Sequence, residues 1–291
     1  MNEVIRAHAA RVRALDPLVG GQDALSAEGQ WLEVAGGVAV ASTDRVEEGT
    51  EAALWSPLVV HRLRARVCGP DPAATLGALI DRWGAEPGEE TGLAVLWPSR
   101  DTAPVRALIE RGFVPIVNIA ARRRGRFEAP VDAAIRPATP DDLDQIAVLY
   151  EALVSFDTQF GWETHRPSAP ALIRASAART LGGAGWCWVA EEGGRVVGFV
   201  SAEPPDRSGW IAWTTTARPV AYLDCMYADP GARGRGVGAA LAAHAHARID
   251  AAGVGVTLLH HAVPNPLSTP FWGRQGYRPI MTQWVRIPRS T

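Results

Sequence analysis

The second half of the chain alternates between short apolar runs and segments in which apolar residues recur every three or four positions. The helical spacing predicts helices over 140–154, 168–181, 236–251 and 266–275. The apolar runs predict strands over 186–192, 196–203, 220–228, 256–262 and 277–287. An early meander followed by β-α-β-α-β predicts an α/β fold, with a mixed sheet that carries helices on both faces.

A weak internal repeat relates the two halves of the chain. Residues 92–116 and 255–280 both contain a short apolar run, a loop, a helix-sized segment, and a glycine followed by an aromatic residue and then Pro-Ile. The offset is about 164 residues, measured from Phe113 to Tyr277. Helical segments at 72–83 and 238–250 recur at nearly the same spacing. We therefore expect two copies of one α/β unit.

The boundary between the copies is marked by a new helix start. Thr139 is a capping residue, Pro140 suits the first helical position, and acids follow in the first turn. We place the domains at 1–128 and 134–291, with a linker at about 126–133.

Composition excludes several classes of protein. The chain has 291 residues, of which 47% are hydrophobic and 21% charged, and its net charge is −2, which is typical of a globular protein without a nucleic-acid partner. Three cysteines without a C-x-x-C pair predict neither disulfides nor a zinc site, so we expect a reducing cytoplasm. The N-terminal segment carries charges every few residues, which favours an amphipathic helix over a membrane span or signal peptide.

One loop in the second half has the chemistry of an anion site. After the strand at 220–228 a turn leads into Arg233-Gly234-Arg235-Gly236-Val237-Gly238, which opens an alanine-rich helix. Glycines leave the amides at a helix N-terminus accessible, and the helix dipole favours a negative ligand such as a pyrophosphate. A dinucleotide fingerprint also fits 234–239, but no strand ending in an acid follows about twenty residues later. A purely structural glycine-rich turn stays open.

This loop resembles the acyl-CoA pyrophosphate loop of the GCN5-related N-acetyltransferases (GNAT). A second family motif, N-x-x-A/S-x-x-F/L-Y-x-x-x-G-F, is matched in register by Asn265, Ser268, Phe271, Trp272, Gly276 and Tyr277. The resemblance covers about 135–287. It implies two tandem GNAT-like domains, each a mixed, mainly antiparallel sheet flanked by helices, and acetyl-CoA as the acyl donor, without a metal.

The resemblance also implies which residues hold the donor. The strand before the loop and the loop itself would bind the pantetheine arm and the pyrophosphate, and the second motif would line the far side. The implied residues are Met226, Tyr227, Ala228, Arg233, Gly234, Arg235, Gly236, Val237, Gly238, Ala239, Asn265, Ser268, Phe271 and Trp272.

Three residues are candidates for the chemistry. Asp224 falls at a carboxylate position proposed as general base in polyamine-type members, and a backbone N–H near Met226 would polarise the thioester carbonyl. His260 ends the fifth strand next to the expected thioester; because neighbouring strand residues face opposite sides, we expect either it or His261 to point into the site. Trp272 stands where the family usually has a tyrosine acid, and an indole cannot donate that proton.

The acceptor is expected to be an amine of a small molecule or peptide. Segments that border the acceptor pocket in the family contain Asp157, Trp162, Glu163 and Trp213, and the acids suit a cationic amine. The expected activity is direct acetyl transfer from acetyl-CoA to this amine, by a monomer or homodimer. The alternative is an acyl-CoA-binding sensor without transferase activity, and an acyl group longer than acetyl also stays open.

The first copy departs from the family pattern. Residues 68–72 read Cys-Gly-Pro-Asp-Pro where the loop would be, Asp101 stands at the asparagine position of the second motif, and Leu108 at the tyrosine position. Prolines remove N–H donors and Asp71 opposes an anion. We therefore expect a degenerate, non-catalytic copy. A second site for another ligand is the alternative.

Overall fold

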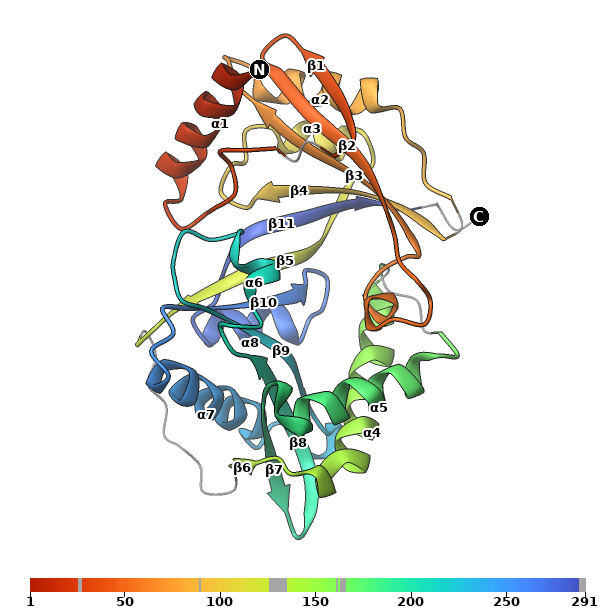
Figure 1. Ribbon diagram of the computed structural model, residues 1–291, viewed down its shortest axis with the longest axis vertical. Helices are drawn as coiled ribbons and strands as arrows, with labels where there is room; N and C mark the ends of the chain where they lie inside the picture. Colours follow the sequence, from red (N-terminus) through yellow and green to blue (C-terminus); the bar gives the residue numbers. More distant parts are fainter. Residues whose placement is uncertain (26–27, 89, 126–134, 161, 163–165, 288–291) are drawn as a thin grey trace.

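The computed structural model describes residues 1–25, 28–88, 90–125, 135–160, 162 and 166–287. All strands of this part form one mixed sheet of eleven strands, in the order β1-β2-β3-β4-β11-β5-β10-β9-β8-β7-β6. In Figure 1 strands β1–β4 occupy the upper part of the sheet and β6–β10 the lower part, with β11 and β5 between them.

The elements follow the hydrophobic pattern closely. In the N-terminal half they are α1 (Asn2–Leu15), β1 (Gln30–Val34), β2 (Gly37–Arg45), the 3-10 helix η1 (Glu51–Leu54), β3 (Val59–Val67), α2 (Pro72–Trp83), β4 (Thr91–Pro98), α3 (Val105–Glu110) and β5 (Val114–Arg123). In the C-terminal half they are β6 (Ile135–Pro137), α4 (Leu143–Asp157), α5 (Ala169–Arg179), η4 (Thr180–Ala184), β7 (Trp186–Glu192), β8 (Arg195–Glu203), α6 (Gly209–Ala212), β9 (Val220–Ala228), α7 (Val237–Ala251), β10 (Val256–Ala262), α8 (Ser268–Arg274) and β11 (Arg278–Arg286). The expected linker at 126–133 lies outside the described residues.

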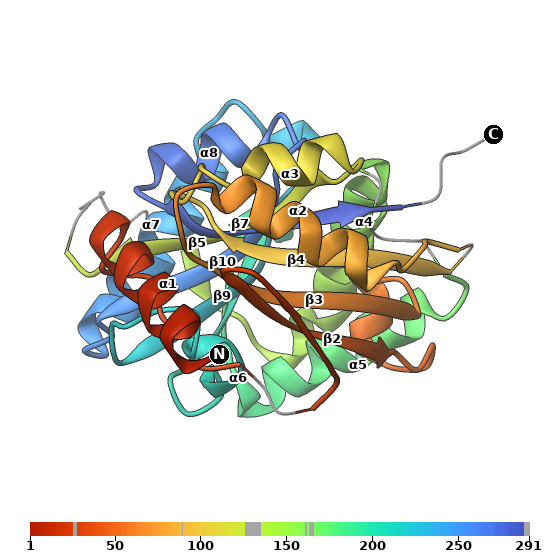
Figure 2. The same ribbon diagram turned by 90° about the horizontal axis from the view of Figure 1, so that it is seen from above.

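Helices cover both faces of the sheet. Helices α2 and α3 pack on β1–β4 and bury a first hydrophobic cluster. Helix α7 packs on a second hydrophobic cluster, which includes Trp272 of α8. Trp284 of β11 belongs to the first cluster and Ala120 of β5 to the second. Their register places these two side chains on the same face, so all four helices lie on that side (Figure 2). Helices α4 and α5 pack on the opposite face.

The two halves exchange their last strands. Strand β11, the C-terminal strand, lies between β4 and β5, and β5 lies between β11 and β10. Each half therefore completes its sheet with the strand of the other half. Both strands begin with the Pro-Ile step of the repeat, and each carries an extra, unpaired residue there, Ile116 in β5 and Ile280 in β11. Proline supplies no N–H to a ladder, so a bulge fits beside it.

In each half two parallel strands separate after a short pairing. Strand β9 pairs with β10 only over Val220–Tyr222 and Val256–Leu258, although both strands continue further. Strand β3 pairs with β4 only over Val59–Arg62 and Thr91–Ala94. The gap between the diverging ends of β9 and β10 positions the site described next. No described helix combines the length and apolar character needed to cross a membrane.

Candidate active site

A cavity of about 610 Å³ opens where β9 and β10 diverge. Residues 222–226 of β9 and 259–262 of β10 line it. Both His260 and His261 belong to this lining, although they point to opposite faces of the sheet. The expectation that only one would face the site is therefore wrong, because the cavity passes between the separated strands and is reached from both faces.

A β-bulge in β9 sets the direction of Asp224. Val200 pairs with Met226 and Ala202 with Leu223, so Asp224 and Cys225 together oppose Ser201. The Ser201 hydroxyl accepts a hydrogen bond from the Cys225 amide and donates one to Asp224, both at 3.3 Å. The bulge turns the Asp224 carboxylate toward the face covered by α4 and α5.

The environment of Asp224 raises the pKa of its carboxyl toward neutral pH. Burial away from water, followed by the negative charges of Glu51 and Glu203, raises its pKa to about 7. The hydrogen bond from Ser201 opposes this rise. A carboxyl with this pKa both accepts a proton from an amine and gives it up again near neutral pH.

Asn265 and Ser268 line the same cavity at the start of α8. The Asn265 carbonyl oxygen accepts hydrogen bonds from the amides of Leu267 and Ser268, at 2.9 and 3.1 Å, and so caps the helix. Its amide donates to Asp157 at 3.1 Å, and burial raises the pKa of Asp157 to about 6. The Ser268 hydroxyl is buried without a hydrogen-bond partner among the described residues, so it is available to a ligand.

His260 is held in an aromatic cluster. Its Nδ1 lies 2.9 Å from the Tyr222 hydroxyl, and its ring stacks on Trp210 with 6.1 Å between centroids. Burial lowers the pKa of His260 to about 4, so the imidazole is neutral at pH 7. Burial also raises the pKa of Tyr222, which therefore keeps its proton. Tyr222 is a cavity-lining phenol that the sequence motif did not single out.

The glycine-rich loop has the form of an anion cradle. Gly234 and Gly236 adopt φ values of 76° and 85°, which only glycine tolerates readily, and Gly236 is the N-cap of α7. The amides of Gly234, Arg235 and Gly236 make no backbone hydrogen bond within the described part of the chain. A Cβ atom built at either glycine meets nothing within 4 Å, so the loop is open to a ligand.

The arginines of the loop are fixed by their own contacts. Arg233 lies over the rings of Phe156 and Tyr227, at 5.8 and 5.3 Å from their centroids. Arg235 donates to Glu192 at 2.8 Å. Tyr227 belongs to the cluster under α4 and α5, so only its backbone is placed to meet a ligand between β9 and β10.

The other predicted residues divide into two groups. Met226, Trp162 and Trp272 line the cavity, and Phe271 packs against Trp272 with 4.9 Å between ring centroids. Trp213 does not belong to the lining: it packs against Gly20 and Gly21 of the N-terminal half and is 46% exposed, which corrects its expected place in the acceptor pocket. Glu163 lies outside the described residues. Val237, Gly238 and Ala239 form the first turn of α7.

The N-terminal half contributes one wall of the cavity, which the sequence did not predict. The contributing residues are Glu51, Ala52, Trp55, Ser56, Arg62 and Val117, and Gln283 of the exchanged strand β11 joins them. Trp55 stacks on Tyr150 of α4 with 6.3 Å between centroids. No motif marks these positions, because they come together only through the shared sheet.

The corresponding gap in the N-terminal half is filled by the chain itself. His8 and Arg11 of α1 reach Val67 at the end of β3: His8 Nδ1 lies 3.3 Å from the Val67 amide, and Arg11 donates to its carbonyl at 3.1 Å. Arg11 also forms an ion pair with Asp101 at 2.6 Å. At the N-terminus of α2, the Asp71 carboxylate accepts from the Ala74 amide at 2.9 Å.

The described residues contain no group of three or more His, Cys, Asp or Glu side chains able to hold a metal ion.

Comparison with known proteins shows what this part of the chain is similar to. Residues 149–277 match the model of the acetyltransferase (GNAT) family. The chain is similar in structure to a GCN5-related N-acetyltransferase from Sphaerobacter thermophilus, with a TM-score of 0.52 and 14% identity over 86% of this chain and 76% of that one. No curated protein matches the chain.

Two further solved structures align with lower scores. A GCN5-related N-acetyltransferase from Kribbella flavida has a TM-score of 0.47 and 15% identity, over 100% of this chain and 97% of that one. A tandem GNAT protein from the clavulanic acid biosynthesis pathway has a TM-score of 0.42 and 15% identity, over 79% of this chain and 75% of that one. The family match spans β9, the glycine-rich loop, α7, β10 and α8, so this part of the chain is similar to an acetyltransferase (GNAT) domain.

Proposed function

We propose that the protein is an N-acetyltransferase that moves an acetyl group from acetyl-CoA directly to a cationic amine, with Asp224 as the general base. The observation that supports the proposal is the position of the Asp224 carboxyl. It lines the cavity between β9 and β10, beside the elements that bind the donor in the family, and its pKa is raised to about 7. Bound acetyl-CoA supplies the activated acetyl group.

The donor is assigned to the side of the cavity that carries α7 and α8. The amides at 234–239 bind the pyrophosphate, the backbone of Met226 and Ala228 faces the pantetheine arm, and the Ser268 hydroxyl offers an unused hydrogen bond. These residues fit an acyl-CoA, because an open helix N-terminus, a separated strand edge and an unpartnered hydroxyl lie along one path.

The proton transfers fall to residues on the opposite wall. Asp224 takes a proton from the acceptor amine as the nitrogen forms its bond to the acetyl carbon. Tyr222 is our candidate for the group that donates a hydrogen bond to the leaving sulfur, since Trp272 cannot give up its proton. His260 holds the Tyr222 hydroxyl, and a base role for His260 is less suited to neutral pH because its pKa is about 4.

The lining favours an amine that carries positive charge. Four carboxylates line the cavity, Glu51, Asp157, Glu203 and Asp224, and its one described arginine, Arg62, already pairs with Asp44. Tryptophan rings at 55, 162 and 210 add faces that attract cations and apolar groups. An acceptor with a free carboxylate finds no unpaired cation in the described lining.

We further propose that the N-terminal half is non-catalytic and binds no acyl-CoA. Strands β3 and β9 have the same length and both lead into a helix, so Val67 corresponds to Ala228. His8 and Arg11 already engage the Val67 backbone, and Asp71 caps the helix start where the pyrophosphate would lie. One donor site per chain is expected.

Two measurements test the proposal. Calorimetric titration with acetyl-CoA is expected to give one site per chain. Release of CoA thiol is then followed with matched amines, such as 1,5-diaminopentane, pentylamine and 6-aminohexanoate, and the dication is expected to have the highest kcat/KM. Binding without thiol release from any amine would instead identify an acyl-CoA sensor, and no binding would refute the loop assignment.

A further inference from the structure

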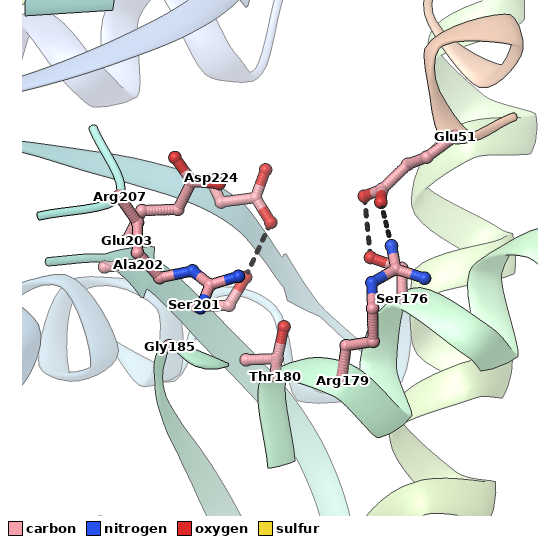
Figure 3. Close-up of a pocket in the computed structure, with 10 residues that line it drawn as sticks. All are labelled: Glu51, Ser176, Arg179, Thr180, Gly185, Ser201, Ala202, Glu203, Arg207 and Asp224. Atoms are coloured by element: carbon pink, nitrogen blue, oxygen red, sulfur yellow. Dashed lines mark hydrogen bonds and ion pairs between the residues drawn. The ribbon is translucent and has the colours of Figure 1, made fainter. Parts of the chain in front are cut away.

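A second, small cavity lies behind Asp224, on the side facing α5 (Figure 3). Its volume is about 70 Å³, enough for several water molecules. Its residues are Glu51, Ser176, Arg179, Thr180, Gly185, Ser201, Ala202, Glu203, Arg207 and Asp224. We call it the polar chamber. It shares Glu51, Glu203 and Asp224 with the large cavity, so these carboxylates stand between the two spaces.

Glu51 reaches the polar chamber from the N-terminal half. Figure 3 shows its carboxylate facing that of Asp224 across the chamber. One Glu51 oxygen accepts from the Ser176 hydroxyl at 2.6 Å and the other pairs with Arg179. Leu54, three residues later, is 1% exposed in the core under α4 and α5. Glu51 is therefore fixed in place by both its head group and its backbone.

We propose that Glu51 is a positioning residue for the catalytic base: across the polar chamber it strengthens the hold of Asp224 on the proton taken from the amine. This inference rests on the proposed acetyl transfer. An ammonium acceptor and acetyl-CoA give an amide, CoA thiol and one proton. The ammonium first gives one proton to Asp224, which passes it to water in the chamber, whose rim is formed by the exposed Arg179 and Arg207. The neutral amine then attacks, and Asp224 takes its second proton as the N–C bond forms and the C–S bond breaks; this proton ends on the leaving sulfur and gives the CoA thiol.

Among the other described groups around Asp224, Glu203 is a second source of negative charge. Glu203 acts in the same direction from β8, but it accepts a hydrogen bond from Trp210 at 2.8 Å and belongs to the C-terminal half. Burial raises the pKa of Tyr150, Tyr222 and Cys225, so these groups stay protonated and neutral at working pH.

Cys187, the two cavity histidines and Asp157 are the remaining titratable groups to consider. Cys187 of β7 also faces Asp224 and has its pKa raised to about 12, so it stays neutral. Across the large cavity, burial lowers the pKa of His260 and His261, which keeps them uncharged. Burial raises the pKa of Asp157 to about 6, so Asp157 requires its own control.

Two variants are expected to move the titration of Asp224 in opposite directions. Glu51→Gln keeps the shape of the side chain and removes its charge, so the midpoint of the kcat/KM–pH profile moves toward acid by about 0.5 unit or more. Arg179→Gln removes the cation that partly neutralises Glu51, so the midpoint moves toward alkali. Damage to the fold alone would not produce opposite shifts.

Two controls accompany them. Glu48→Gln removes one charge from an exposed position on the same segment and is expected to leave the midpoint unchanged. Asp157→Asn removes the other carboxyl that titrates in this range, so a midpoint that persists in this variant belongs to Asp224. Thermal unfolding of every variant confirms that it is folded.

A second readout does not depend on activity. The carboxyl carbons of 13C-labelled aspartates are titrated by NMR in the wild type and in Glu51→Gln, and Asp224→Asn identifies the signal. A lower midpoint in Glu51→Gln supports the inference, and identical midpoints overturn it. An absence of acetyl transfer in the wild type would instead refute the proposed function, and the NMR titration distinguishes the two failures.

Discussion

Asn118 and Thr282 lie opposite each other where β5 pairs with β11, and the Thr282 hydroxyl donates to the Asn118 side-chain oxygen at 2.9 Å. The two residues are 164 positions apart, the offset of the sequence repeat. The bulged residues Ile116 and Ile280 are separated by the same interval. This pair therefore marks the centre of an approximate twofold relationship between the halves, at which each half receives the last strand of the other.

Thr282→Val is expected to destabilise the whole protein by about 1 to 3 kcal/mol, because the buried Asn118 amide oxygen loses its donor and Ser99, 2.9 Å from the Thr282 hydroxyl, loses its partner. Urea unfolding measures the loss. Thr282→Ser keeps the hydroxyl and is the matched control, expected to unfold closer to wild type. Equal losses in the two variants would show that the methyl group, and not the hydrogen bond, is responsible.

The sequence predicted the elements well, because their signals are local. The helices and strands of the C-terminal half differ from the expected bounds by only a few residues, and the capping signal at Thr139 and Asp142 forms a capping box. The strand exchange was not predictable in this way. Strands β5 and β11 share a Pro-Ile step and a similar apolar pattern, so neither pattern specifies which of two similar sheet edges the strand joins.

The same reasoning separates the predicted site residues from the missed ones. Asp224 and the loop at 233–239 belong to motifs with fixed spacing. Glu51 is one acid in a polar segment, and only the packing of Leu54 under α4 and α5 brings it to the cavity. Trp213 was misplaced because its segment follows no regular period, and the structure packs it on Gly21.

Gly236→Ala tests the proposed pyrophosphate cradle. At a φ of 85° a residue with a side chain is strained, so we expect the loop to shift and its amide N–H groups to point away from the pyrophosphate. Calorimetry is then expected to show that the affinity for acetyl-CoA falls about tenfold or more. Gly253→Ala is the matched control, since Gly253 has a φ of 79° and equally open surroundings beyond the far end of α7. Both variants lose stability, but only the first is expected to lose affinity. Equal affinities would remove the loop from the binding site.

Asp224→Asn is expected to lower kcat by about 10²–10⁴-fold with little change in acetyl-CoA affinity. In the wild type, kcat/KM should fall tenfold per pH unit below about 7, because the base becomes protonated. A stopped assay over pH 5 to 9 measures both effects. A rate within a few-fold of wild type would exclude Asp224 as the base.

Asp224→Asn is also expected to change how the stability of the folded protein depends on pH. Asp224 has a higher pKa in the folded protein than the ordinary carboxyl value of 3.8, so the folded state binds the proton more tightly and stability declines as the pH rises from about 4 to about 7. Asp224→Asn removes this decline. Its melting temperature should exceed that of the wild type at pH 8 and match it near pH 4, and the opposite order at pH 8 would contradict the raised pKa.

Arg11→Met tests whether α1 closes the N-terminal gap. Asp101 is 1% exposed, and loss of its ion pair leaves a buried carboxylate without a cation, which we expect to cost about 3 kcal/mol in urea unfolding. Arg106→Met breaks the exposed Arg106–Glu110 pair and serves as the control with nearly unchanged stability. Because Asp71 still caps α2, the acetyl-CoA stoichiometry should stay at one per chain. A second site appearing in Arg11→Met would show that α1, and not the lost loop, keeps the N-terminal half from binding acyl-CoA.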